Sequence, residues 1–286
     1  MRSSRARVAV VGHVEWVQFS RVPHVPSRGE VLHARDPFEE PAGGGAVAAV
    51  QLARLAGEAT LITALGEDEY ARRSLTRLRE LGVDVRAARR EAATRRALTL
   101  LDDGGERTII TLGPRLEPRG DDGELGWGRL GALDCVYFTA GDLGALRAAR
   151  RAARVLVASP RAADALGRGV ALDALVMSAG DTIERREAAR AENDAELVVL
   201  TAGAHGGTYR TRRGESGTWA PAPLPSEPVD AYGLGDSFAA GLAFGLGAGL
   251  AVPEALALAA RCGAACLCGR GPYGRQLTGQ ELEQDP

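Results

Sequence analysis

One stretch decides the fold and the chemistry of this chain: Val229-Asp230-Ala231-Tyr232-Gly233-Leu234-Gly235-Asp236-Ser237-Phe238-Ala239-Ala240-Gly241. A Gly-x-Gly turn ends in an acid, and an almost uncharged pattern rich in Ala and Leu, typical of a buried helix, follows at once. Such a turn directs several backbone N–H groups to one side at the start of a helix. The unpaired donors and the positive end of the helix dipole together create an anion site.

Asp236 requires its own explanation, because an aspartate at an anion site repels the anion. As a general base, Asp236 would take a proton from a hydroxyl while the N–H groups hold a phosphate beside it. As a structural residue, it would cap the N-terminus of its helix. This stretch alone does not decide between the two roles.

The composition excludes several classes of phosphate-binding protein. The sequence contains no lysine, so all 35 side chains counted as Lys or Arg are arginine. A Walker-type phosphate loop, a protein kinase fold and a Schiff-base enzyme each need a lysine. Phosphoryl transfer by this chain would therefore rely on backbone amides and arginine.

Length and charge are those of an ordinary α/β protein. The 286 residues suit one large α/β domain or two smaller ones, and a hydrophobic content of 45% allows a sizeable core. A net charge of −2 gives no reason to expect nucleic acid or a membrane surface as a partner. We find no signal-peptide pattern, and the apolar run at residues 238–253 is shorter than the ~20 residues of a membrane span. We therefore expect a cytoplasmic protein.

The cysteines and histidines form no recognisable disulfide or metal pattern. Cys135 stands alone, and Cys262, Cys266 and Cys268 cluster in an Ala-rich segment. The chain has no Cys-x-x-Cys pair, and its four histidines are scattered. We interpret the cysteines as small buried hydrophobic residues on a helix rather than as ligands.

Short apolar strands alternate with helical segments, which predicts a parallel sheet with helices on both faces. The first strand is expected within residues 7–14, a continuous apolar run. A hairpin at 97–112 and strand-like pieces within 15–40, among them 30–34, should pair into a small separate sheet. Further strands are predicted at 58–65, 135–139, 155–158, 174–178 and 197–201, and helices at 42–56, 67–81, 143–153, 235–247 and 253–268.

These pieces resemble the ribokinase-like (PfkB-type) carbohydrate kinase family over about residues 8–273. One motif is the glycine-opened helix at 42–55, and the other is the stretch quoted first, where Gly233-Leu234-Gly235-Asp236 stands for the family's Gly-Ala-Gly-Asp. Supporting matches, in the same order and spacing, are Arg28-Gly29-Glu30, Thr94, Asp103-Gly104-Gly105-Glu106-Arg107-Thr108 and Thr201-Ala202-Gly203-Ala204-His205-Gly206-Gly207.

The resemblance implies a three-layer αβα sandwich with a mostly parallel central sheet and a small β-sheet lid. It implies a single kinase domain over residues 1–286, with lid strands drawn from about 15–40 and 95–113. It also implies transfer of the γ-phosphate of ATP to a hydroxyl of a sugar or sugar-like small molecule, with Mg²⁺ accompanying the ATP. A homodimer formed partly through lid pairing is expected as well.

The resemblance also implies roles for individual residues. Asp236 would be the general base, and the anion hole would be formed by the N–H groups of Gly233, Leu234, Gly235 and Asp236. Contacts with ATP are expected from Thr201, Gly203, Gly206, Asp230 and Cys262. Contacts with the substrate are expected from Glu15, Val17, Gly43, Gly44, Gly45 and Val47. Weak contacts with Mg²⁺, through water, are expected from Ser178 and Asp181; the alternative is that these residues only end a strand and cap a helix.

Three positions depart from the family pattern. Val17 stands where sugar-binding members carry an acid, and Val47 stands where they carry an asparagine. Valine cannot form the hydrogen bonds of either residue, so Glu15, two residues earlier, is the best remaining acceptor for a substrate hydroxyl. The alternative is that Glu15 points to solvent or pairs with an arginine. The family's Asn-x-x-Glu appears as Ser178-Ala179-Gly180-Asp181, whose oxygen atoms have a shorter reach.

The departures leave two hypotheses open. The intact Gly233-Leu234-Gly235-Asp236 favours an active ATP-dependent kinase. Val17, Val47 and Ser178 favour a degenerate member that binds nucleotide or metabolite as a sensor without efficient turnover. A dehydrogenase, another enzyme class on such sheets, is not supported, because no dinucleotide fingerprint follows the first strand.

Overall fold

The computed structural model describes residues 6–284 of the chain. Within this part, nine strands form a central sheet in the order β13-β12-β11-β10-β9-β8-β1-β4-β5. Their bounds, in that order, are Ser216–Trp219, Gly207–Thr211, Ala195–Thr201, Leu172–Ser178, Ala153–Ala158, Leu133–Phe138, Val8–Val11, Ala59–Gly66 and Val83–Arg90. Neighbouring strands from β11 to β5 are parallel, and β12 and β13 add antiparallel pairs at one edge.

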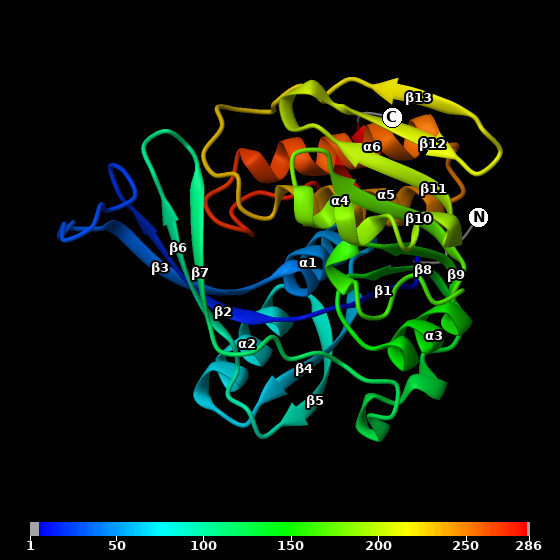
Figure 1. The fold of residues 1–286 in the computed structure, drawn as a ribbon, viewed down its shortest axis with the longest axis horizontal. Coiled ribbons are helices and arrows are strands. Elements are labelled where there is room, and N and C mark those ends of the chain that lie inside the picture. The colour runs from blue at the N-terminus through cyan, green and yellow to red at the C-terminus, as the bar shows by residue number, and fades with distance from the viewer. Residues whose placement is uncertain (1–5, 285–286) are drawn as a thin grey trace.

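Helices cover both faces of this sheet, which is why its central strands are apolar throughout. All four residues of β1, for example, are buried. One face packs under α1 (Gly44–Ala56), α2 (Glu69–Glu80), α5 (Leu234–Gly247) and α6 (Val252–Leu267), and the other under α3 (Leu143–Ala152) and α4 (Thr182–Ala188). Figure 1 shows α5 and α6 side by side, and the short α7 (Gly279–Gln284) contacts α1. The predicted αβα sandwich is confirmed.

A second, small sheet projects from the main body, at the left of Figure 1. Its strand order is β3-β2-β6-β7, with bounds Arg35–Ala42, Glu15–Arg21, Arg96–Leu101 and Arg107–Leu112. Phe19 on β2 stacks on Phe38 of β3 with ring centroids 4.7 Å apart, and it meets Tyr232 edge-on at 4.8 Å. These aromatic contacts join the small sheet to the loop that precedes α5.

Two local expectations differ from the structure. Residues 30–34, expected as a strand, contain no strand, and β3 begins only at Arg35. β5 was not expected, because Val-Asp-Val-Arg-Ala-Ala-Arg-Arg lacks a continuous apolar run. β5 lies at the edge of the central sheet, where charged side chains reach solvent and an apolar pattern is not required.

No helix in the described part of the chain is long and apolar enough to cross a membrane. Residues 238–253, the apolar run noted in the sequence, instead supply most of α5 and the first residues of α6. The expected cytoplasmic location stays a prediction.

Candidate active site

The start of α5 is the centre of the candidate active site. Gly233 is the N-cap residue, with φ of 82° and ψ of −1°, a left-handed conformation that favours glycine. Among the described residues no side chain caps this helix, and the N–H groups of Leu234, Gly235 and Asp236 have no hydrogen-bond partner. These free donors, together with the helix dipole, suit an anion.

Asp236 lies within the first turn of α5 and does not cap it, so the capping hypothesis is wrong. Its side chain is 11% exposed and pairs with Arg161. Nη1 of Arg161 donates to Oδ1 of Asp236 at 3.1 Å and to Oδ2 at 3.3 Å. A nearly buried carboxylate therefore lies in the same helical turn as the free N–H groups.

Arg161 is held in place by a second acid. It lies in the turn Pro160–Ala162 after β9, and its Nε donates to Oε1 of Glu184 at 3.0 Å. Oε2 of Glu184 in turn accepts the backbone N–H of Ser178 at 2.9 Å. The negative charge of Asp236 outweighs the effect of burial and, with Glu184, raises the pKa of Arg161, so this cation is permanent.

The start of α1 lies directly against the start of α5. Gly43 is the N-cap of α1, and the N–H of Gly45 donates to the carbonyl oxygen of His13 at 3.1 Å. A Cβ atom at Gly45 would lie 2.6 Å from that oxygen, so the close approach requires glycine. A Cβ atom at Gly44 would lie 2.9 Å from Oδ1 of Asp236. The two glycine-opened helices therefore share one small space.

His13 and Glu15 lie on the other side of Gly43 and are 6% and 7% exposed. Oε2 of Glu15 forms an ion pair with Nε of Arg95 at 3.4 Å. Burial raises the pKa of Glu15, while Arg95 and other arginines oppose that rise. Burial also lowers the pKa of His13 well below its ordinary value, and the charge of Arg115 lowers it further. His13 is therefore a neutral imidazole near neutral pH.

Val17 and Val47 do not line the candidate site, and the expectation that they contact substrate is wrong. Both are 0% exposed and belong to the hydrophobic core on the α5 face of the sheet. Val47 packs against Gly233, where an added Cβ atom would lie 2.8 Å from Cγ1 of Val47. The surrounding chain closes over both valines and leaves no surface for a ligand.

The residues expected to bind ATP differ in their exposure. Thr201 ends β11, half-buried, and Gly203 opens the exposed turn Gly203–His205 that follows. Gly206, directly after that turn, is buried. Cys262 is 0% exposed and packs in an apolar cluster of α6, so a direct contact of Cys262 with ATP is wrong. The pattern of α6 did not reveal which of its faces is covered.

Asp230 is buried and already bound by backbone groups. Its Oδ1 accepts the N–H of Tyr232 at 2.8 Å, and its Oδ2 accepts the N–H of Gly271 at 3.0 Å. The carboxylate thereby ties the loop before α5 to the segment after α6. A contact of Asp230 with ATP stays a prediction.

Asp181 caps α4: its Oδ1 accepts the N–H groups of Ile183 at 2.9 Å and of Glu184 at 3.0 Å. The carboxylate of this region that connects to Asp236, through Arg161, is that of Glu184. Within residues 6–284, no group of three or more His, Cys, Asp or Glu side chains is placed to hold a metal ion. The water-mediated role of Ser178 and Asp181 toward Mg²⁺ therefore stays a prediction.

Sequence reasoning missed the partners of the two acids, Arg161 for Asp236 and Arg95 for Glu15. It also missed the polar residues around these pairs, Glu184, His13 and Arg115. Arg161 had one usable signal, because it closely follows a buried strand of a parallel sheet, at the carboxyl edge where ligands bind. Arg95 directly follows Thr94, a residue of the matched motifs. Pairing between these side chains depends on contacts across the fold and has no local pattern.

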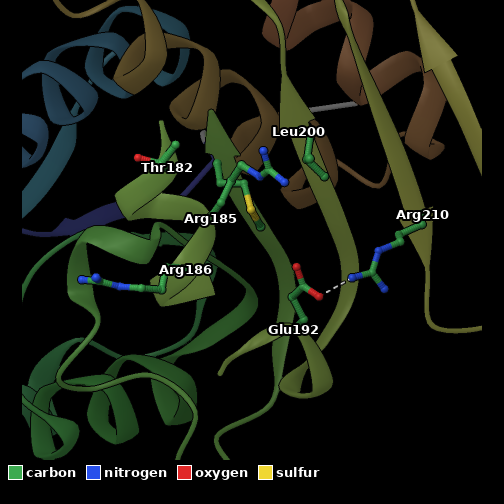
Figure 2. A pocket seen from close by; sticks show the side chains of 7 residues that line it. Thr182, Arg185, Arg186, Glu192, Leu200 and Arg210 are labelled. Atoms are coloured by element: carbon green, nitrogen blue, oxygen red, sulfur yellow. Dashed lines mark hydrogen bonds and ion pairs between the residues drawn. The ribbon is translucent and has the colours of Figure 1, made fainter. Parts of the chain in front are cut away.

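A separate hollow lies between α4 and the strands β10, β11 and β12 (Figure 2). The side chains that surround it are those of Met177, Thr182, Arg185, Arg186, Glu192, Leu200 and Arg210. Glu192 and Arg210 form an ion pair there, and all three arginines are exposed. No site residue expected from the sequence lines this hollow, so it is distinct from the site at Asp236.

Comparison with known proteins assigns the family. The family model for pfkB family carbohydrate kinases matches residues 5–156 and 171–277. The chain belongs to this family. It is 30% identical over 279 residues to the ATP-dependent ribose-1-phosphate kinase of Halopiger xanaduensis, with 90% of each chain covered. It is 25% identical over 266 residues to the ribokinase of Mus musculus, covering 84% of this chain and 81% of that protein.

Solved structures confirm the ribokinase-like fold. The ribokinase of Giardia lamblia superposes with a TM-score of 0.78 at 17% identity, and that of Thermotoga maritima with 0.77 at 20% identity, each pair covered to 98%. Arabidopsis thaliana ribokinase, complexed with ribose and ATP, gives a TM-score of 0.73 at 19% identity with 98% of both chains covered. Family and fold together identify an ATP-dependent carbohydrate kinase.

Proposed function

We propose that this protein transfers the γ-phosphate of ATP to a hydroxyl of a sugar or sugar-like small molecule, with Asp236 as the general base. One observation carries the proposal: the nearly buried carboxylate of Asp236 lies in the first turn of α5, beside free N–H groups and against Gly44. The names of two relatives make ribose and ribose 1-phosphate the first acceptors to test.

In the proposed reaction the acceptor hydroxyl lies between Asp236 and the γ-phosphate. The bond from its oxygen to phosphorus forms while the bond from phosphorus to the ADP oxygen breaks, and the proton passes to Asp236. The N–H groups of Leu234 and Gly235 offset the charge on the transferred group. Arg161 supplies a permanent positive charge next to this group, in a chain that has no lysine for the purpose.

Mg²⁺ is the counter-ion that we propose for ATP, and when bound it neutralises charge on the phosphates that hold it. The start of α4 suits a water-mediated contact with such an ion. In the described part of the chain, Oδ1 of Asp181 takes both capping bonds and Oδ2 has no hydrogen bond. That oxygen is free to accept a hydrogen bond from a metal-bound water.

The test is ATP-dependent phosphorylation of a panel that pairs free and phosphorylated sugars. The panel contains ribose, ribose 1-phosphate, ribose 5-phosphate, fructose, fructose 1-phosphate and fructose 6-phosphate. We expect at least one acceptor to yield ADP and a phosphorylated product, at a rate well above ATP hydrolysis without acceptor. Binding of ATP with turnover of no acceptor would instead support the sensor hypothesis.

We also propose a homodimer that forms through β7, an outer strand of the small sheet. All residues of β7 are exposed, including Ile109, Ile110 and Leu112 at 41%, 49% and 46%. An unpaired strand edge with exposed apolar side chains favours pairing with another chain. Light scattering at micromolar concentration should give the mass of two chains, and Ile110→Glu should reduce it to one. A mass of one chain for the unaltered protein would contradict the dimer.

A further inference from the structure

Three arginines from separate segments surround the acceptor side of the site. Arg95 precedes β6, Arg115 follows β7, and Arg161 follows β9. Their side chains are 19%, 29% and 39% exposed, compared with 9% for Glu15 and 11% for Asp236. The guanidinium groups are therefore more open to solvent than the two carboxylates.

Each guanidinium group lies near an acid or a carbonyl oxygen and keeps free donors. Nε of Arg95 forms an ion pair with Oε2 of Glu15 at 3.4 Å, and neither atom has a hydrogen-bond partner among the described residues. Nη2 of Arg115 pairs with Glu117 at 2.5 Å and donates to the carbonyl oxygen of Arg161 at 2.9 Å. Within residues 6–284, no hydrogen bond engages the two Nη atoms of Arg95, Nε and Nη1 of Arg115, or Nη2 of Arg161.

The charges of these three arginines all act on the buried side chain of His13. Beyond burial, the charges that lower the pKa of His13 are those of Arg115, Arg161 and Arg95. The same three arginines act on Glu15. Nδ1 of His13 has no hydrogen-bond partner among the described residues, although the side chain is almost fully buried. A ligand that reaches this space would meet a neutral imidazole surrounded by cations.

The free groups at this side are mostly hydrogen-bond donors. A free sugar needs acceptors for its hydroxyl protons as well as donors. Val17 and Val47 supply neither, because both are closed within the core. Glu15 offers acceptor oxygens, since its Oε2 is in an ion pair with Arg95 at 3.4 Å but has no hydrogen-bond partner among the described residues, and the free donors of the three arginines outnumber them. A fully ionised phosphate group accepts hydrogen bonds and donates none. A guanidinium group can donate two hydrogen bonds at once to the phosphate oxygens. The donor-rich side of the site therefore matches a phosphate better than another hydroxyl.

We propose that Arg95, Arg115 and Nη2 of Arg161 bind a phosphate group that the acceptor already carries, so that the substrate is a phosphorylated sugar. This inference rests on the proposed function. Glu15 lies against Gly43 and Asp236 against Gly44, so the two carboxylates flank a single peptide unit and both can face one small acceptor.

The reacting hydroxyl of this acceptor lies at Asp236 and its phosphate lies toward Arg95 and Arg115. The γ-phosphate leaves ADP and bonds to the hydroxyl oxygen, whose proton passes to Asp236. The phosphate that the acceptor brought stays intact. The product is therefore a sugar bisphosphate.

The test measures kcat/KM for the free and the phosphorylated members of the acceptor panel in the unaltered protein, Arg95→Gln, Arg115→Gln and Arg96→Gln. Arg96 is the matched control, because it adjoins Arg95 but is exposed and lies over the ring of Tyr70, 5.3 Å from its centroid. We expect the unaltered protein to prefer a phosphorylated acceptor by about 100-fold or more. Arg95→Gln and Arg115→Gln should each raise KM for that acceptor about 10- to 100-fold, the usual effect of losing a charge-assisted hydrogen bond.

KM for ATP should change little in Arg95→Gln and Arg115→Gln. KM for the free sugar should rise less than KM for the phosphorylated sugar. Arg96→Gln should match the unaltered protein in all of these constants. Melting curves separate a loss of folding from a loss of binding. A preference for the free sugar, or an unchanged KM for the phosphorylated acceptor in both Arg95→Gln and Arg115→Gln, overturns the phosphate subsite while the proposed kinase function stands. Turnover of no acceptor at all, with ATP still bound, overturns the proposed function and the subsite with it.

Discussion

The starts of α1 and α5 look alike in sequence but differ in what surrounds their glycines. Both helices are Ala-rich and buried, and both N-cap glycines have positive φ, 87° at Gly43 and 82° at Gly233. Inside α1, a Cβ atom at Gly45 would lie 2.6 Å from a backbone carbonyl oxygen. Inside α5, a Cβ atom at Gly235 would meet nothing within 4 Å.

This difference separates two uses of glycine. At Gly45 the missing side chain lets two backbone segments touch, which brings the start of α1 against β1 and Asp236. At Gly235 it leaves open space beside free N–H groups, where a phosphate has room to approach. The left-handed residue of this turn is Gly233 and not Gly235, so alanine at position 235 meets no backbone strain. We therefore expect substitutions at the start of α5 to affect the chemistry and substitutions at the start of α1 to affect packing.

Asp236→Asn should have the largest effect on activity, because the proposed proton acceptor lies on α5 and α1 has no counterpart. Asparagine keeps the size of the side chain and can still accept a hydrogen bond from Arg161, but it cannot take the hydroxyl proton. Turnover of a confirmed acceptor should fall roughly 10²- to 10⁴-fold, the usual contribution of a general base. ATP affinity and melting temperature should change little. Near-normal turnover would leave Asp236 with no role beyond its ion pair with Arg161.

Gly45→Ala should destabilise the protein by about 1–3 kcal/mol or more, because the added Cβ atom meets the backbone of His13 and Gly12, which cannot rotate away. Urea unfolding measures the loss. Gly235→Ala is the matched control: its Cβ atom meets open space, and alanine favours a helix over glycine by up to about 1 kcal/mol. Its unfolding free energy should hold or rise, while its turnover falls. Equal destabilisation by the two variants would remove the distinction drawn between the two helix starts.

Gly233→Ala should lower the unfolding free energy by about 1–2 kcal/mol, because alanine is strained at the left-handed φ of this position. Its Cβ atom would also lie 2.8 Å from Cγ1 of Val47. The double variant Gly233→Ala with Val47→Ala should therefore lose less stability than the sum of the two single variants. Strict additivity in chemical unfolding would show that the two side chains do not meet.

Asp181→Ala should have the smallest effect, a loss of about 1 kcal/mol of unfolding free energy, because it removes the side-chain cap of α4. Among the described residues, no side chain caps α1 or α5. Asp181→Asn is the control, since asparagine caps a helix about as well as aspartate. If Asp181 also acts on Mg²⁺ through water, both variants should need more Mg²⁺ for half-maximal rate. An unchanged Mg²⁺ titration would leave capping as the only role of Asp181.

Several features of this protein were determined by its sequence alone. The alternation of apolar strands and helices predicted the layered α/β fold, because a strand covered on both faces must be apolar and a covering helix must carry one apolar side. The Gly-x-Gly-Asp turn before an uncharged helix placed Asp236 at a helix start with free N–H groups. Both inferences depend on residues within a few positions of one another, and local sequence determines such geometry.

Other features were decided only by the tertiary structure. Local pattern could not show that Val17, Val47 and Cys262 lie closed within the core, because burial depends on what covers an element from elsewhere in the chain. It also could not show that Asp236 meets Arg161, a partner 75 residues away. The contact between Glu15 and Arg95 likewise joins segments that are distant in sequence. The charges around a site come from whichever segments the fold brings together, and electrostatic forces act through space rather than along the chain.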